Sequence, residues 1–154
     1  MLKVKHYYVN ILDAPELIPF TIKLKKNLSD SLREQEKARQ ELDNFINMLK
    51  KDFREPIWYI GFDVIGEKFF ERFIFENGGF LEIMMEAPLA INAHFVHLER
   101  AEKFSKALKK TLTKLLPKKP ITKMVLENID IGTEEVDELK VNEWSKLKSI
   151  RESI

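Results

Sequence analysis

Histidine is the residue type best suited to acid–base or metal chemistry in this chain, because its unperturbed pKa lies near neutrality. Only three histidines occur among the 154 residues, and His94 and His97 stand three apart with glutamates close behind. On a helix this spacing would bring two imidazoles and a carboxylate to one face, a set able to bind Zn²⁺ in a metal-dependent enzyme. If the segment is a strand, the two histidines point to opposite faces and the site disappears. The apolar line that follows His97 favours a structural role for that residue.

No other motif indicates catalysis. The chain has no cysteine, which excludes a cysteine nucleophile, a thiolate zinc site and a disulfide framework. It has neither a Gly-x-Ser-x-Gly elbow nor a glycine-rich phosphate loop. We therefore expect no cofactor, and the sequence favours a non-enzymatic protein over an enzyme.

The strongest charge asymmetry lies between Arg100 and Lys123, where nine basic residues accompany a single acid for a net charge of +8. On a helix, these cations would lie largely opposite the apolar stripe and face solvent or phosphates. The nucleic-acid-binding alternative rests on Lys103, Lys106, Lys110 and Lys114. Against it, the polar side carries no interleaved aromatic residue for base stacking, and a solvated lysine face is common.

Residues 54–99 have the opposite character, with a net charge of −5. Several of these acids fall on a predicted sheet face that also carries aromatic residues and methionine, a mixture typical of protein-binding surfaces. The expected partner-binding residues are Tyr59, Asp63, Phe70, Glu82, Met84 and Glu86. A protein partner or a second copy of the chain is the leading expectation, and coverage by residues 133–154 within the monomer is the alternative.

The acidic residues belong to a predicted three-stranded antiparallel meander over residues 57–86. A two-residue loop at Gly66-Glu67 would place Ile60 opposite Phe73 and Trp58 opposite Phe75, and a three-residue loop at 77–79 would place Phe73 opposite Ile83. The apolar side chains then share one core face, interrupted by Glu71. The predicted core face is Trp58, Ile60, Phe62, Val64, Phe69, Phe73, Phe75, Leu81, Ile83 and Met85.

Four further elements flank the meander. Residues 2–12 alternate like a strand, and Ser31 with Glu34 has capping-box spacing for a helix that ends before Pro56. Residues 93–98 fit either a strand or the first turn of a second helix that runs to about Leu116. Residues 121–131 read as a strand. Residues 133–154 read as a C-terminal helix, because acids at its first turn suit the helix dipole.

The element order β-α-β-β-β-α-β-α predicts an α+β fold, a mostly antiparallel sheet with helices packed on it. The length fits a single domain over residues 1–154. The net charge of +1 gives no global attraction to nucleic acid or membrane. No apolar run reaches the length of a bilayer span, and no secretory signal pattern opens the chain, so we expect a cytoplasmic protein without membrane contact.

Overall fold

The computed structural model describes residues 2–11, 31–65, 68–84, 90–115, 126, 127 and 129–139. Of residues 31–38, 64, 65, 68, 69, 84 and 90, only the backbone is described. None of the helices in these ranges is long and apolar enough to cross a membrane.

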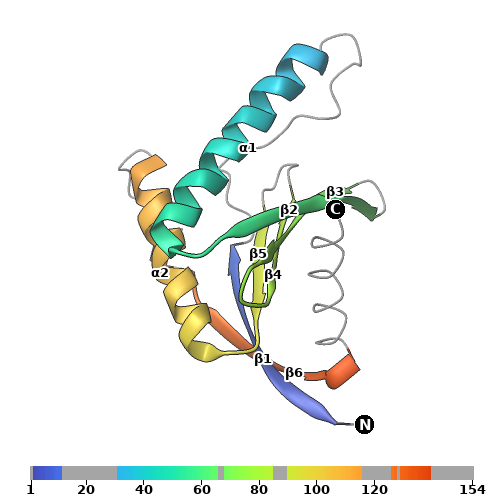
Figure 1. Ribbon diagram of the computed structural model, residues 1–154, viewed down its shortest axis with the longest axis vertical. Helices are drawn as coiled ribbons and strands as arrows, with labels where there is room; N and C mark the ends of the chain where they lie inside the picture. Colours follow the sequence, from blue (N-terminus) through green and yellow to red (C-terminus); the bar gives the residue numbers. More distant parts are fainter. Residues whose placement is uncertain are drawn as a thin grey trace.

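Six strands form one antiparallel sheet in the order β2-β3-β4-β5-β1-β6. The strands are β1 (Lys3–Ile11), β2 (Ile57–Ile65), β3 (Lys68–Phe75), β4 (Phe80–Met84), β5 (Ala90–Phe95) and β6 (Ile131–Asp137). The helices are α1 (Ser31–Phe53) and α2 (Leu98–Leu115), and both lie on the same side of the sheet (Figure 1). The α+β fold with an antiparallel sheet is thereby confirmed.

The core lies between the two helices and one face of the sheet, which we call the helix-side face. Its centre is a cluster of four buried phenylalanines whose ring centroids lie between 4.8 and 6.1 Å apart, mostly in edge-to-face contact. They come from both helices and from two strands: Phe53, Phe104, Phe75 and Phe95. Each fully buried ring contributes about 1.5–3 kcal/mol, so this cluster fixes the helices on the sheet.

Helix α1 begins at Ser31 and ends at Phe53, as its cap and Pro56 predict. Its described apolar stripe is buried, and the helix extends well beyond the sheet at its N-terminal end (Figure 1). Arg54 then takes a left-handed conformation with φ of 61°, and its N–H still donates to the Lys50 carbonyl at 2.8 Å. Glycine is the usual residue in this position after a helix.

The meander is confirmed, but a β-bulge in β2 overturns part of its predicted pairing. Gly61 pairs with Arg72 as expected. Before Gly61 the pairing is shifted by one residue, so that Tyr59 rather than Ile60 lies opposite Phe73, and this shift continues to the start of the strand. Gly61 has φ of 128°, which an L side chain rarely adopts, and so accommodates the extra residue. The bulge turns Ile57 into the core and Trp58 out of it, the reverse of our expectation.

The turn between β3 and β4 also differs in register. Phe73 lies opposite Leu81 rather than Ile83, because the chain reverses over residues 76–78 and not over residues 77–79. A shift of two residues keeps every side chain on its predicted face. Phe73, Phe75, Leu81 and Ile83 are accordingly all buried.

The segment that the sequence left open is a strand followed by a helix. β5 ends at Phe95, and α2 begins at Leu98 after a bend. The sheet therefore gains a strand between β4 and β1 that the predicted order lacked.

The C-terminal prediction is wrong over the residues that the structure describes. Residues 126 and 127 are helical rather than extended, and residues 131–137 form β6 where we expected the first helical turn. Pairing with β1 outweighs the helix signal of the acids, and charged side chains are typical of an edge strand. Residues 138 and 139 are helical, and the rest of the predicted helix lies outside the described residues.

Candidate binding site

The predicted partner-binding residues do not form one surface. Asp63, Phe70 and Glu82 lie on the sheet face opposite the helices, which we call the second face, and Met84 occupies the matching register position beside Phe70. Tyr59 lies on the helix-side face, because the bulge reverses its direction; its ring stacks under the Arg39 guanidinium of α1 at 4.3 Å. Glu86 lies outside the described residues.

The acidity of the second face is partly compensated by an arginine. Arg72 lies between Asp63 and Glu82, with N–O distances of 3.4 and 3.6 Å. Burial raises the pKa of Glu82, and this effect outweighs the opposing attraction of Arg72. His6 and Ile74 on the same face are buried. The second face is therefore not the open acidic patch that the sequence suggested.

Most of the lysines in the nucleic-acid alternative contact carboxylates of their own chain. Lys103 lies 3.2 Å from Glu55, and Lys110 and Lys114 lie 3.7 and 2.9 Å from Asp52. Although burial raises the pKa of Asp52, hydrogen bonds from Thr111 and Lys114 hold it below its ordinary value. Lys106 is exposed. The positive charge of α2 is thus partly neutralised by the carboxylates at the end of α1.

The two histidines of the metal alternative are not arranged as that hypothesis requires. His94 lies on β5 between the rings of His6 and Phe80, at centroid distances of 5.3 and 4.4 Å, while His97 is exposed in the bend after the strand. Within the described ranges, no three His, Asp or Glu side chains gather as a metal-binding group. The helical spacing that suggested a zinc site does not occur.

The outer edge of β2 carries the most prominent exposed apolar surface among the strands. β2 is an edge strand, and in the part of the chain that the structure describes it pairs only with β3. Trp58 and Tyr59 are each 41% exposed and Phe62 is 62% exposed. They lie on both sides of the strand, with Trp58 on the second face and Tyr59 on the helix-side face.

The two edges of the sheet differ in a way that bears on association. Edge strands usually carry charges that discourage pairing with another chain. β6 follows this rule with Glu134 and Glu135, both exposed, whereas β2 has Asp63 as its one charged residue in nine. We had assigned Trp58 and Phe62 to the core; the glycine within the strand was the signal for a bulge that would have placed Trp58 correctly.

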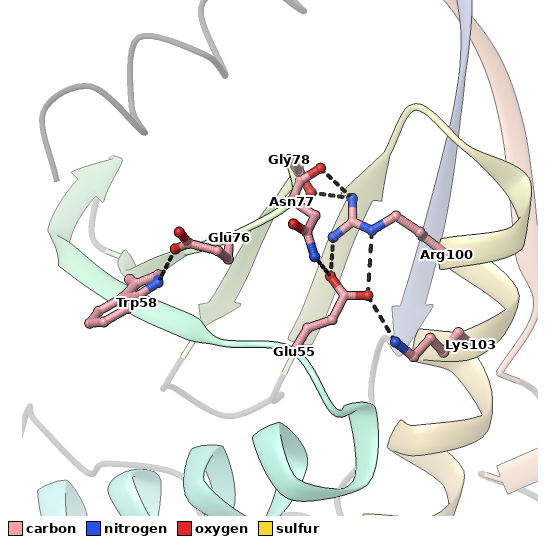
Figure 2. Close-up of polar contacts among 7 residues, drawn as sticks. All are labelled: Glu55, Trp58, Glu76, Asn77, Gly78, Arg100 and Lys103. Carbon is pink, nitrogen blue, oxygen red and sulfur yellow. Dashed lines mark hydrogen bonds and ion pairs between the residues drawn. The ribbon is translucent and has the colours of Figure 1, made fainter. Parts of the chain in front are cut away.

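A hollow of about 390 Å³ opens at the beginning of β2. It is lined by Lys50, Arg54, Glu55, Pro56, Ile57 and Trp58. The indole N–H of Trp58 donates to Glu76 at 2.6 Å, which holds one wall in place (Figure 2).

The carboxylate in the wall of this hollow is already fully engaged. Glu55 accepts hydrogen bonds from Arg100 at 2.7 Å, from Lys103 at 3.2 Å and from Asn77 at 3.2 Å (Figure 2). Burial alone would raise the pKa of Glu55, but these donors hold it below its ordinary value. Within the described residues, neither Lys50 nor Arg54 forms an ion pair, so the hollow has unmatched positive charge.

The left-handed conformation of Arg54 predicts a stabilising substitution. Arg54→Gly should raise the free energy of unfolding by about 0.5–1 kcal/mol, because glycine adopts this φ without steric cost. Arg54→Ala is the control, since alanine loses the guanidinium but keeps the strained backbone. Chemical denaturation of the three proteins measures both effects. Equal stability of Arg54→Gly and Arg54→Ala would contradict the assigned conformation.

No protein-family model, curated protein or solved structure matches the chain.

Proposed function

We propose that this protein is a non-enzymatic interaction protein that associates through the exposed edge strand β2, and that its partner at this edge is a second copy of the chain. The observation that carries the proposal is the aromatic, nearly uncharged edge, with Phe62 62% exposed. Within the part of the chain that the structure describes, β2 pairs on one side only, and two such edges that pair would add backbone hydrogen bonds on the other side and cover the aromatic side chains.

The charges around β2 favour a second copy over an unrelated strand. In antiparallel pairing about a two-fold axis, the beginning of one strand meets the end of the other. The beginning of β2 is flanked by the cations of Lys50 and Arg54, and its end carries Asp63. The edge is therefore complementary to itself in charge. A second copy also brings the same bulge and twist, which an ordinary flat strand lacks.

The oligomeric state of the purified protein tests the proposal. Sedimentation equilibrium over a range of concentrations should give a reversible dimer. Phe62→Lys should weaken this dimer by about tenfold or more, because it places a charge on the pairing edge. Leu139→Lys is the matched control, since Leu139 is 61% exposed but lies beyond β6.

Two results would overturn the proposal. The first is a monomer at every concentration. The second is a dimer that Phe62→Lys leaves intact, or that Leu139→Lys disrupts equally, since either result would place the interface elsewhere. Thermal unfolding of each variant establishes that the substitutions act on association rather than on folding.

A further inference from the structure

We infer that the exposed lysine face of α2 binds the phosphate backbone of double-stranded DNA. The lysines of this face follow one another at intervals of three and four residues, which place side chains in one row along a helix. The row consists of Lys103, Lys106, Lys110 and Lys114. At 1.5 Å per residue it is roughly 16 Å long. The row lies on a different element from the β2 edge, so DNA binding does not depend on dimerisation.

Two buried carboxylates hold three of these lysines in place without removing them from solvent. The Nζ atoms of Lys110 and Lys114 lie 3.7 and 2.9 Å from Asp52. The Nζ atom of Lys103 lies 3.2 Å from Glu55. The two acids are only 4% and 7% exposed, whereas the three lysine side chains are between 45% and 65% exposed. Because an ammonium group has three donors, each lysine can contact the carboxylate beneath it and a phosphate outside it.

The face keeps a positive charge when these ion pairs are taken into account. Arg100 also binds one of the two acids, so four cations surround two carboxylates. Lys106 is exposed and adds a further charge. The exposed acids of α2, Glu99 and Glu102, both precede a stretch from Lys103 to Leu115 that has five lysines and no acid. An anionic partner therefore complements this face.

The composition of the face favours duplex DNA among anionic partners. Protein interfaces are depleted in lysine and use aromatic residues and arginine as anchors. Membrane surfaces bind apolar side chains as well as cations, but on α2, which the structure describes throughout, Leu98 is the one large apolar side chain that is exposed, and it precedes the lysines. Single strands stack their bases on aromatic rings, and the one aromatic residue of α2, Phe104, is buried. Duplex DNA, with about one negative charge per 1.7 Å, needs only cations for binding without sequence preference.

The salt dependence of DNA binding tests the site. In fluorescence anisotropy with a labelled duplex of about 30 base pairs, the logarithm of the affinity should fall with the logarithm of the salt concentration with a slope of about −3 to −4, as four phosphate contacts require. Lys106→Gln combined with Lys110→Gln should reduce this slope by about two and weaken binding by about tenfold or more at about 0.1 M salt. Both lysines are exposed, and thermal unfolding establishes that the variant is folded.

The matched control removes the same charge from another surface. Lys3→Gln combined with Lys5→Gln changes two exposed lysines of β1, whose N-terminal end lies away from α2 (Figure 1). This variant should bind the duplex with the original affinity and slope. The DNA site is wrong if the original protein does not bind the duplex at low salt, or if the two double variants weaken binding equally. It is also wrong if single-stranded DNA or anionic lipid vesicles bind more tightly than the duplex.

Discussion

Glu55→Gln should lower the free energy of unfolding by about 3 kcal/mol, because it removes the charge that neutralises a largely buried arginine. The Arg100 side chain is only 15% exposed and lies 2.7 Å from Glu55. Arg100 also donates to the Asn77 and Gly78 carbonyls of the β3–β4 turn (Figure 2). The same carboxylate therefore joins the end of α1, this turn and α2, and its loss leaves Arg100 uncompensated.

The control for this prediction is Asp52→Asn, the same acid-to-amide change three residues earlier. Asp52 pairs with Lys110 and Lys114, whose side chains are 65% and 46% exposed. Water solvates these lysines when the partner is lost, so we expect a cost of about 1 kcal/mol or less. Urea unfolding monitored by circular dichroism measures both variants. Equal losses would show that the burial of Arg100 does not decide the effect.

The sequence predicts the helices and the meander because these elements have regular local signals. The helical spacing of Leu42, Ile46 and Leu49 identifies α1, and all three residues are buried. The glycines after Asn77 mark the turn between β3 and β4, although the turn lies one residue earlier than predicted and the pairing therefore shifts by two residues. Local periodicity is sufficient to predict an element when that element has one apolar face.

The bulge in β2 escapes prediction because the strand is apolar at consecutive positions. Residues 57–60 are Ile, Trp, Tyr and Ile. The inward side chains are therefore largely apolar whether residues 57 and 59 or residues 58 and 60 point into the core. The choice depends on packing: Ile57 fits beside Phe75, while Trp58 reaches Glu76 outside the core. Gly61 marks a position where a bulge is tolerated, but contacts between the strands decide whether the bulge forms, and a single sequence does not contain those contacts.

β6 escapes prediction for a different reason. Glu134 and Glu135 resemble the first turn of a helix, and nothing nearby in the sequence signals pairing with a strand more than 120 residues away. The edge position then permits charges that an inner strand would exclude. Long-range pairing thus determines a segment that local propensity assigns to a helix.

The candidate site is predictable only in part. Tyr59 and Asp63 were identified from their residue types, and both lie on β2. The hollow depends on how the end of α1 meets the beginning of β2, and on a left-handed arginine where glycine is usual. Neither feature has a sequence signal.

Acidification should destabilise the protein through His94. Burial, together with the neighbouring His6, lowers the pKa of His94 from 6.5 to about 4. The unfolded chain therefore takes up this proton at a higher pH than the folded chain, and stability is lost as the pH falls from about 6.5 to about 4. The full shift corresponds to a loss of about 3 kcal/mol from this residue alone.

A variant that lacks the titrating group isolates this contribution. His94→Phe retains a ring against Phe80 but binds no proton, so its stability should fall by about 3 kcal/mol less than that of the original protein between pH 7 and pH 4. His97→Gln is the control variant, because His97 is exposed in the bend after β5 and lies outside the ring stack. Urea unfolding at each pH measures the difference in stability between the variants, from which contributions common to both proteins cancel. Parallel pH profiles for His94→Phe and the original protein would mean that His94 is accessible to protons in the folded state and is not held neutral by the stack.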